Sequence, residues 1–553
     1  VIAIGLVVDD AIVVVENVHR HIEGGLQPLD AALRGAREVA LPVIAMTLTL
    51  AAVYAPIAFL GGLTGVLFSE FALTLAGSVL VSGIIALTLS PMMCAYVLRD
   101  HAHQGKAADW LDARFHWLQE AYRARLAGCL DNRGAVLLFA GGILASLPLL
   151  FAFAQKELAP EEDNGGLFVI ATPPDHANID YVDRYLHQIV AAWRALPEVS
   201  HSWQANEPTQ IFGGVELKPW SQRERSQKEI QAELQANFAR ISGLEIFTFA
   251  PASLPGSDAG LPVNFVISST ADYTELERVS NEVLARARES GLFAFVNKTL
   301  RYSRPELAVS IDRELAARLG VSMEAIGETL RTMLGGVELN RFSVEGRSYR
   351  VIPQAHRGFR LTPEALERYY VRTTSDALVP LSTLIRPQSR VEPNSLTQYQ
   401  QLNSVTVQGM MMPPNSLGTG LAFLERTLSE VAPVGFRPGY EGEARRFVQE
   451  QSGFGTLFAV SLLFIFLVLS AQFNSFRDPL VVLVSVPLSI FGAVVPLAIG
   501  LGTLNIYTQV GLLTLIGLIS KHGILIVDFA NRRVSEGLAR REAVLEAAAP
   551  AGA

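Results

Sequence analysis

Six apolar runs, each long enough to cross a lipid bilayer, constrain the fold of this chain more than any other feature. They occupy residues 40–63, 66–98, 135–154, 453–473, 479–502 and 507–530. Because a helix of about 20 apolar residues covers the hydrocarbon core, these runs predict six membrane spans. Residues 1–18 predict one further span. We expect the chain to be a fragment, since no initiator Met or polar segment comes before this run.

Composition and motifs exclude several classes of protein. The formal net charge of −8 comes without any block rich in Lys or Arg, so nucleic-acid binding is not expected. No Gly-rich loop ends in Gly-Lys-Ser or Gly-Lys-Thr, which excludes a P-loop ATPase within this sequence. The polar segment shows no nucleophile–base cluster and no metal-ligand spacing, so neither an enzyme nor a metal site is expected.

Basic residues indicate which side of the membrane each loop occupies, because loops rich in Lys and Arg resist translocation. They gather after the first span, between the third and fourth spans, and after the last span. Alternate crossings then place residues 155–452 outside, which for a bacterial inner membrane is the periplasm. Residues 109–130 have the pattern of an amphipathic helix on the cytoplasmic membrane surface, although an ordinary connector helix fits them equally well.

The polar segment alternates strands with helices. Strands 167–172, 198–204, 214–218 and 244–249 with helices 181–196 and 227–241 predict a βαββαβ unit. A second unit begins with strand 263–268, helix 273–290 and strands near 293–302 and 307–311, and its next helix is 417–431. A separate subdomain is therefore expected between about 312 and 397. The predicted fold class is a membrane α-helical bundle with an α+β periplasmic domain.

An internal repeat relates the first and last spans. They align without a gap at an offset of 512 residues, which matches Asp9 with Lys521 and Glu16 with Asp528. The alignment indicates a duplication. If the offset is the repeat period, roughly 380 residues precede Val1 and two more spans follow Ala553.

Three charged residues lie in the middle of predicted spans, where an unpaired charge costs several kcal/mol. Asp9 and Asp10 are in the first span and Lys521 is in the last, so the repeat predicts that they meet. Two acids beside one lysine form a site that can exchange a proton and so couple a proton gradient to helix movement. A static ion pair that fixes helix register is the alternative. His522 either joins the relay or faces elsewhere, because adjacent helix residues differ by about 100 degrees.

Two motifs identify a resemblance to a known family. They are GLVVDDAIVVVEN at residues 5–17 and GLLTLIGLISKHGILIVDFA at residues 511–530, and LTLSPMMC at 87–94 and LKPW at 217–220 add to them. These segments resemble the hydrophobe and amphiphile multidrug branch of the resistance-nodulation-division (RND) efflux transporters. The resemblance implies a homotrimer in the bacterial inner membrane that exports small hydrophobic substrates by proton/substrate antiport. Its implied partners are a periplasmic adaptor protein and an outer-membrane channel, and it needs no cofactor besides the proton gradient.

The resemblance also divides the chain into named parts. These are spans at 1–18, 40–98, 135–154 and 453–530, cytoplasmic segments at 99–134 and 531–553, porter subdomains at 160–253 and at 254–311 with 398–441, and a docking subdomain at 312–397. A metal-ion or lipid exporter of the same fold, or a membrane protein for assembly or signalling, remains the alternative.

By resemblance, the family's relay acids match Asp9 and Asp10, and its relay lysine matches Lys521. The family has an asparagine where this chain has His522. Trp203 falls where the family places a pocket-lining aromatic residue, although a structural role fits it as well. The family's switch loop is short here, at residues 206–213, and Phe212 is its single aromatic residue. Trp203 and Phe212 are therefore the predicted substrate-binding residues.

Overall fold

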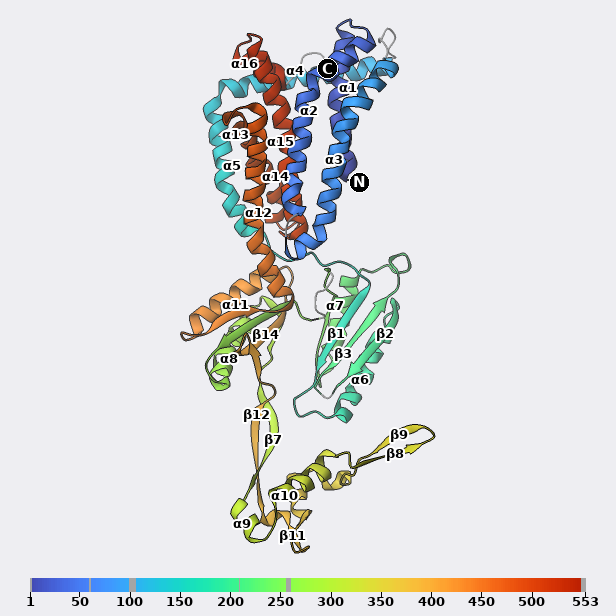
Figure 1. The fold of residues 1–553 in the computed structure, drawn as a ribbon, viewed down its shortest axis with the longest axis vertical. Coiled ribbons are helices and arrows are strands. Elements are labelled where there is room, and N and C mark those ends of the chain that lie inside the picture. Colours follow the sequence, from blue (N-terminus) through green and yellow to red (C-terminus); the bar gives the residue numbers. More distant parts are fainter. Residues whose placement is uncertain (1, 59–60, 99–105, 208, 255–259, 549–553) are drawn as a thin grey trace.

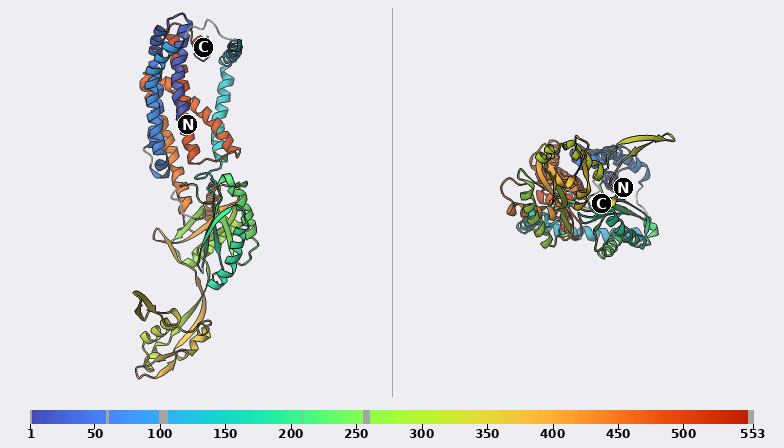
Figure 2. Two further views of the ribbon diagram at one scale, coloured as in Figure 1. Left: turned by 90° about the vertical axis from the view of Figure 1, so that its right-hand side faces the viewer. Right: turned by 90° about the horizontal axis from the view of Figure 1, so that it is seen from below.

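The computed structural model describes the chain except for residues 1, 59–60, 99–105, 208, 255–259 and 549–553. The parts of the predicted spans, connector, switch loop, second porter subdomain and final cytoplasmic segment that fall on these residues lie outside the described structure. The molecule is elongated (Figures 1 and 2). A helical bundle forms one end, two sheets with their helices form the middle, and a narrow two-stranded stalk leads to a small distal unit.

The bundle is built from long apolar helices. Its helices are α1 (Ile2–Glu23), α2 (Pro28–Ala58), α3 (Gly62–Val97), α5 (Arg133–Phe153), α12 (Gly442–Phe473), α13 (Arg477–Leu483), α14 (Ser485–Ala498) and α15 (Ile506–Ser535). Within the described residues, six helical segments are long and apolar enough to span a membrane, and each overlaps one predicted run. No residue of α5 is buried in the bundle. Such an apolar surface suits contact with lipid.

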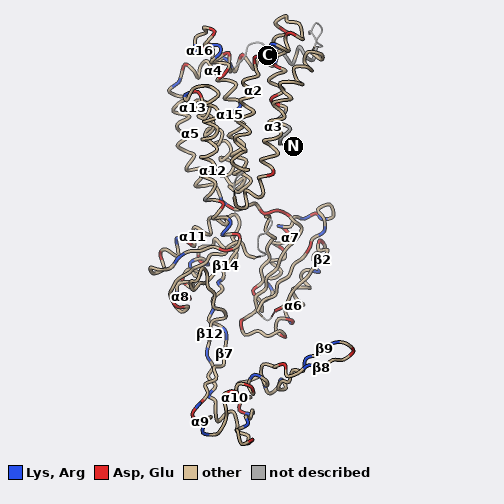
Figure 3. The backbone as a smooth tube through the Cα atoms, in the orientation of Figure 1, with Lys and Arg blue, Asp and Glu red and all other residues tan. Residues whose placement is uncertain are grey.

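Most charged residues of the bundle lie toward its ends (Figure 3). At the end remote from the sheets, α4 (Lys106–Asp131) lies across the bundle beside α16 (Arg540–Ala548). Arg541 of α16 lies 3.0 Å from Asp131 of α4. Helix α2 begins 12 residues before the apolar run that predicted it, and within this added polar part Glu38 pairs with His21 of α1 at 2.8 Å.

The first sheet unit follows α5. Its elements are β1 (Gly166–Thr172), α6 (Ile179–Arg194), β2 (Val199–Asn206), β3 (Ile211–Leu217), α7 (Gln227–Phe238) and β4 (Glu245–Phe249). The strands pair antiparallel in the order β2-β3-β1-β4. Alternate residues of β1 are buried with α6 and α7, namely Leu167, Val169 and Ala171. The residues between them face the other side of the sheet, since side chains in a strand alternate.

The second sheet unit also lies in the middle of the molecule, and the chain continues from it into α12. It contains β5 (Val263–Ser269), α8 (Tyr273–Glu289), β6 (Phe293–Lys298), β13 (Thr397–Tyr399), β14 (Leu402–Met411), α11 (Leu417–Val431) and β15 (Arg437–Tyr440). Strand β14 lies between β5 and β6, so a strand that follows the insertion completes the centre of the sheet.

The strand predicted at residues 307–311 forms, but it does not belong to this sheet. Residues 307–311 belong to β7 (Tyr302–Ile311), which leaves the sheet and pairs antiparallel with β12 (Ile385–Pro393). The two strands form the stalk to the distal unit (Figure 1). That unit contains α9 (Arg313–Arg318), α10 (Met323–Leu330), β8 (Asn340–Val344), β9 (Arg347–Val351), β10 (Tyr370–Arg372) and β11 (Leu378–Pro380).

Candidate functional site

Helices α1 and α15 bring the three predicted mid-span charges together. Lys521 Nζ lies 2.6 Å from Asp10 Oδ1 and 2.9 Å from Asp9 Oδ2. Lys521 and Asp10 are each 1% exposed, whereas the Asp9 side chain is 40% exposed. Ser82 of α3 donates a hydrogen bond of 3.1 Å to the second oxygen of Asp10. These four residues form the ion cluster.

Small residues let the helices around the ion cluster approach closely. A Cβ atom added to Gly83 of α3 would lie 2.5 Å from Thr47 of α2, and one added to Gly517 of α15 would lie 3.0 Å from Leu50 of α2. A Cβ atom at Gly35 of α2 would lie 3.0 Å from a side-chain carbon of Val18 in α1. Small residues at such contacts are typical of helix packing in membranes. Helix α2 thus holds α1, α3 and α15 in the positions that join their polar residues.

The ion cluster has the chemistry of a proton site. Two carboxylates facing one ammonium group carry one uncompensated negative charge, and a single proton on either acid neutralises it. The two acids differ in burial, since the Asp9 side chain is 40% exposed and that of Asp10 is 1% exposed. Protonation would weaken the attraction between α1 and α15, since it removes one of the charges that face Lys521.

His522 lies outside the ion cluster. Its Nδ1 atom is 3.1 Å from the carbonyl oxygen of Leu518, and the side chain lines a cavity between α1, α2 and α15. Glu16 and Asp528, which the repeat aligns, line the same cavity. Asp528 pairs with Arg532 at 2.8 Å.

Aromatic side chains gather on the face of the first sheet opposite α6 and α7. The ring centroids of Trp203 and Phe212 are 5.4 Å apart, and Phe168 of β1 lies 5.6 Å from Phe212 and 6.3 Å from Trp203. Phe249 of β4 adjoins Phe168 at 5.7 Å. We call these four residues the aromatic platform. Its Trp203 is 49% exposed, so the platform presents a ring surface to its surroundings.

Phe212 reaches the platform from a strand and not from the predicted loop. It pairs with Ala205 of β2 and Ile170 of β1 in the sheet. The hairpin connection is short because Glu207 and Gln210 exchange backbone hydrogen bonds of 2.9 and 3.3 Å. Sequence reasoning missed Phe168, although its alternation with buried Leu167 and Val169 places it on the same face as Trp203 and Phe212.

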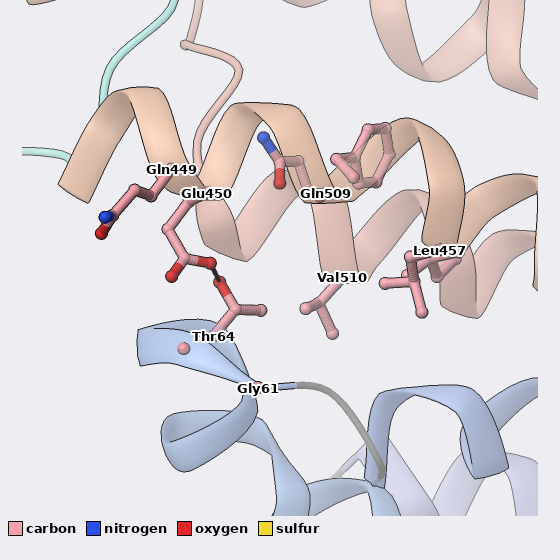
Figure 4. A pocket seen from close by; sticks show the side chains of 11 residues that line it. Gly61, Thr64, Gln449, Glu450, Leu457, Gln509 and Val510 are labelled. Carbon is pink, nitrogen blue, oxygen red and sulfur yellow. Dashed lines mark hydrogen bonds between the residues drawn. The ribbon is translucent and has the colours of Figure 1, made fainter. Parts of the chain in front are cut away.

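A further contact joins α3 to α12, the bundle helix that follows the second sheet unit in the chain. Glu450 of α12 accepts hydrogen bonds from the backbone N–H of Leu63, at 2.9 Å, and from the Thr64 hydroxyl, both in the first turn of α3. A cavity of about 270 Å³ adjoins this contact, and Figure 4 shows Glu450 pointing at Thr64 across it. Carboxylates are favourable at a helix N-terminus, where backbone N–H groups have no partner in the helix. No sequence motif or repeat pointed to this contact.

A bundle of long apolar helices that encloses an ion cluster, with a sheet-rich domain attached, defines an integral membrane transporter. The chain belongs to the AcrB/AcrD/AcrF family, whose model matches residues 1–550. This confirms the resemblance to RND multidrug efflux transporters, a family of the inner membrane.

Individual relatives cover nearly the whole chain. It is 39% identical over 558 residues to an uncharacterized transporter of Haemophilus influenzae, an alignment with 99% of this chain and 54% of the relative. It is 31% identical to the multidrug/solvent efflux pump membrane transporter MepB of Pseudomonas putida, over 99% of this chain and 54% of that protein. The multidrug export protein AcrF of Escherichia coli is 30% identical over 96% of this chain and 53% of AcrF. The chain thus spans about half the length of the curated relatives it matches.

Proposed function

We propose that this chain is part of a proton-driven RND efflux pump that exports hydrophobic or amphiphilic compounds by proton/substrate antiport. The observation that supports the proposal most strongly is the buried pairing of Asp10 with Lys521 at 2.6 Å. Burying such charges in an apolar bundle is costly, and intramembrane ionisable groups mark ion pathways. In this account the pair breaks when a proton reaches the cluster, and α1 and α15 then shift relative to each other.

The aromatic platform favours drug-like substrates over metal ions. Large rings bind hydrophobic molecules through contact area and stacking, without fixed hydrogen bonds. Among the residues that the structure describes, no group of three or more His, Cys, Asp and Glu side chains could hold a metal ion. Trp203 and Phe212, with Phe168, are the substrate-binding residues of the proposal.

The proposal includes the assembly that the family resemblance implies. The pump works as a homotrimer in the bacterial inner membrane, with the sheet units in the periplasm. Residues 160–253 and residues 254–311 with 398–441 are the porter subdomains, and residues 312–397 are the docking subdomain that meets an adaptor protein or an outer-membrane channel. The contact of Glu450 with α3 links movement in the bundle to the second porter subdomain, because α12 continues directly from that unit.

Dye accumulation in a bacterial strain that lacks its own pumps tests this function. The whole transporter that contains this chain should keep a fluorescent hydrophobic dye out of the cells, and a protonophore should abolish the exclusion. Asp10→Asn should abolish it too, whereas Asp30→Asn, at an exposed position of α2, should not. If dye exclusion survives in the Asp10→Asn variant, the ion cluster is structural and proton-coupled efflux is refuted.

A further inference from the structure

The cavity lined by His522 extends from the neighbourhood of the ion cluster toward the end of the bundle remote from the sheets. Its volume is about 280 Å³. Asp9 is the more exposed acid, and Val13, one helical turn further along α1, lines the cavity. At the far end, Arg20 of α1 and Ala547 of α16 line it. The cavity therefore begins about one helical turn from the ion cluster, although none of the four cluster residues lines it, and it leads toward one end of the bundle.

Polar groups from three helices line this cavity. Its lining includes the charged residues Glu16, Arg20, Glu38, Asp528 and Arg532. Most of these are engaged. Arg532 pairs with Asp528 at 2.8 Å and donates to the Glu38 carbonyl oxygen at 2.7 Å. Glu38 also accepts from His21 at 2.8 Å. Apolar residues make up most of the rest of the cavity wall, so the charged groups lie within a largely apolar lining.

His522 differs from these groups because one ring nitrogen is left to accept a proton. A carbonyl oxygen only accepts hydrogen bonds, so the contact with Leu518 places the hydrogen on Nδ1. In the neutral ring, Nε2 then has a lone pair. Such a nitrogen can accept a proton and release it again. His522 follows Lys521 directly in α15, so it lies beside the cluster without belonging to the ion pairs.

We propose that His522 accepts the proton that leaves the ion cluster and passes it to water in this cavity, so that the cavity is the exit path of the coupling proton. The inference rests on the proposed function. In the first step the O–H bond of protonated Asp9 breaks, and a proton moves through water to Nε2, where an N–H bond forms. The carboxylate that remains pairs again with Lys521. In the second step the imidazolium releases the Nε2 proton to water and returns to its neutral form.

Chemical rescue tests this role directly. The whole transporter would be reconstituted in vesicles that contain a pH-sensitive dye, and substrate-dependent proton flux would be measured. We expect His522→Ala to lower the flux by about tenfold or more, the effect of removing a positioned proton acceptor. Imidazole added on the side of the cavity opening should restore a large part of this flux. It should restore none in Asp10→Asn, which lacks the cluster itself.

The outcomes separate this inference from the proposed function. Unchanged flux in His522→Ala would overturn the inference alone, provided that Asp10→Asn is inactive. A loss that imidazole does not repair would show a structural role for the ring and would also overturn it. If His522→Ala unfolds, His522→Gln serves for the same rescue, since it keeps a polar side chain of similar size. If the unaltered protein shows no substrate-dependent proton flux, the proposed function and the inference fail together.

Discussion

Lys521 Nζ lies 2.6 Å from Asp10 Oδ1, although the two residues come from opposite ends of the chain. Both are almost fully buried, and the cost of desolvation is offset by their pairing, by Asp9 beside Lys521 and by the hydrogen bond from Ser82 to Asp10. The pair therefore helps to hold the bundle together and is also part of the proposed proton site. Mutation can separate these two roles.

Removal of Lys521 alone should destabilise the bundle. Lys521→Met leaves two acids without their cation, and we expect a loss of about 3 kcal/mol in the free energy of unfolding. Adding Asp10→Asn should recover most of this loss, because one of the buried charges disappears too. Both variants should be inactive in dye efflux. Thermal unfolding in detergent measures the first effect, with Lys228→Met at an exposed position of α7 as the control. A double variant as unstable as Lys521→Met would contradict the pairing.

The first turn of α3 offers a matched pair of glycine variants. Gly62 has a φ of +75°, and a Cβ atom there would lie 2.8 Å from Glu450 Oε1. Gly61 has a φ of −85° and nothing within 4 Å of its Cβ position. We expect Gly62→Ala to cost about 1–2 kcal/mol of stability and to lower efflux, since it strains the backbone and displaces Glu450. Gly61→Ala should have little effect. Equal thermal unfolding of the two variants would show that the contact is unimportant.

The loop before β1 gives a pH-dependent prediction outside the membrane. Burial alone would raise the pKa of Asp163, but hydrogen bonds from Arg223, the Gln227 backbone and Trp220 outweigh it and hold the pKa at about 2. Because the pKa is lower in the folded protein, the Asp163 carboxylate stabilises the fold at pH values above 3.8, the pKa of the unfolded chain. This stabilisation is lost as the pH falls from 3.8 toward about 2. Arg223 is 2% exposed, so Asp163→Asn leaves a buried cation without its carboxylate.

Thermal unfolding at several pH values checks this prediction. Asp163→Asn should be clearly less stable than the unaltered protein at pH 7, and the difference should shrink as the pH is lowered below 3.8. Asp183→Asn, at an exposed position of α6, should unfold like the unaltered protein. A difference that is independent of pH would mean that the charge of Asp163 is not what stabilises this loop.

The aromatic platform predicts substrate-selective effects. Trp203→Ala removes the most exposed ring, and we expect the accumulation of planar aromatic dyes to rise about threefold to tenfold, because aromatic contact contributes about 1 kcal/mol. Trp203→Phe should retain most of the efflux. Tyr370, an exposed aromatic residue of the distal unit, provides the control Tyr370→Ala. If the Trp203 and Tyr370 variants accumulate dye equally, the platform does not bind substrate.

The sequence predicted the parts of this molecule that depend on local pattern. Apolar runs mark spans because the bilayer imposes their length, and the aligned repeat indicated that Asp9, Asp10 and Lys521 would meet. Family membership followed from motifs around the same residues. The role of these charges in proton transfer remains a prediction.

Other features arise from contacts between distant segments, which no local pattern encodes. Strand β7 has the alternation of a sheet strand, yet it pairs with β12 beyond the insertion. The contact of Glu450 with Thr64 joins residues far apart in sequence, and each is an ordinary polar residue by itself. The orientation of His522 depends on how α1 and α2 pack beside α15. The sequence therefore left two alternatives for this side chain, and in the structure it lines a cavity outside the ion cluster.

Proton flux in reconstituted vesicles tests the central claim most directly. The whole transporter would be placed in vesicles with a trapped pH-sensitive dye, and a hydrophobic substrate would be added with and without an imposed pH gradient. The account predicts that substrate drives proton movement in the unaltered protein and in Asp30→Asn, and that Asp10→Asn transports neither protons nor substrate. Substrate transport by Asp10→Asn at the unaltered rate would contradict proton coupling through the Asp10–Lys521 pair.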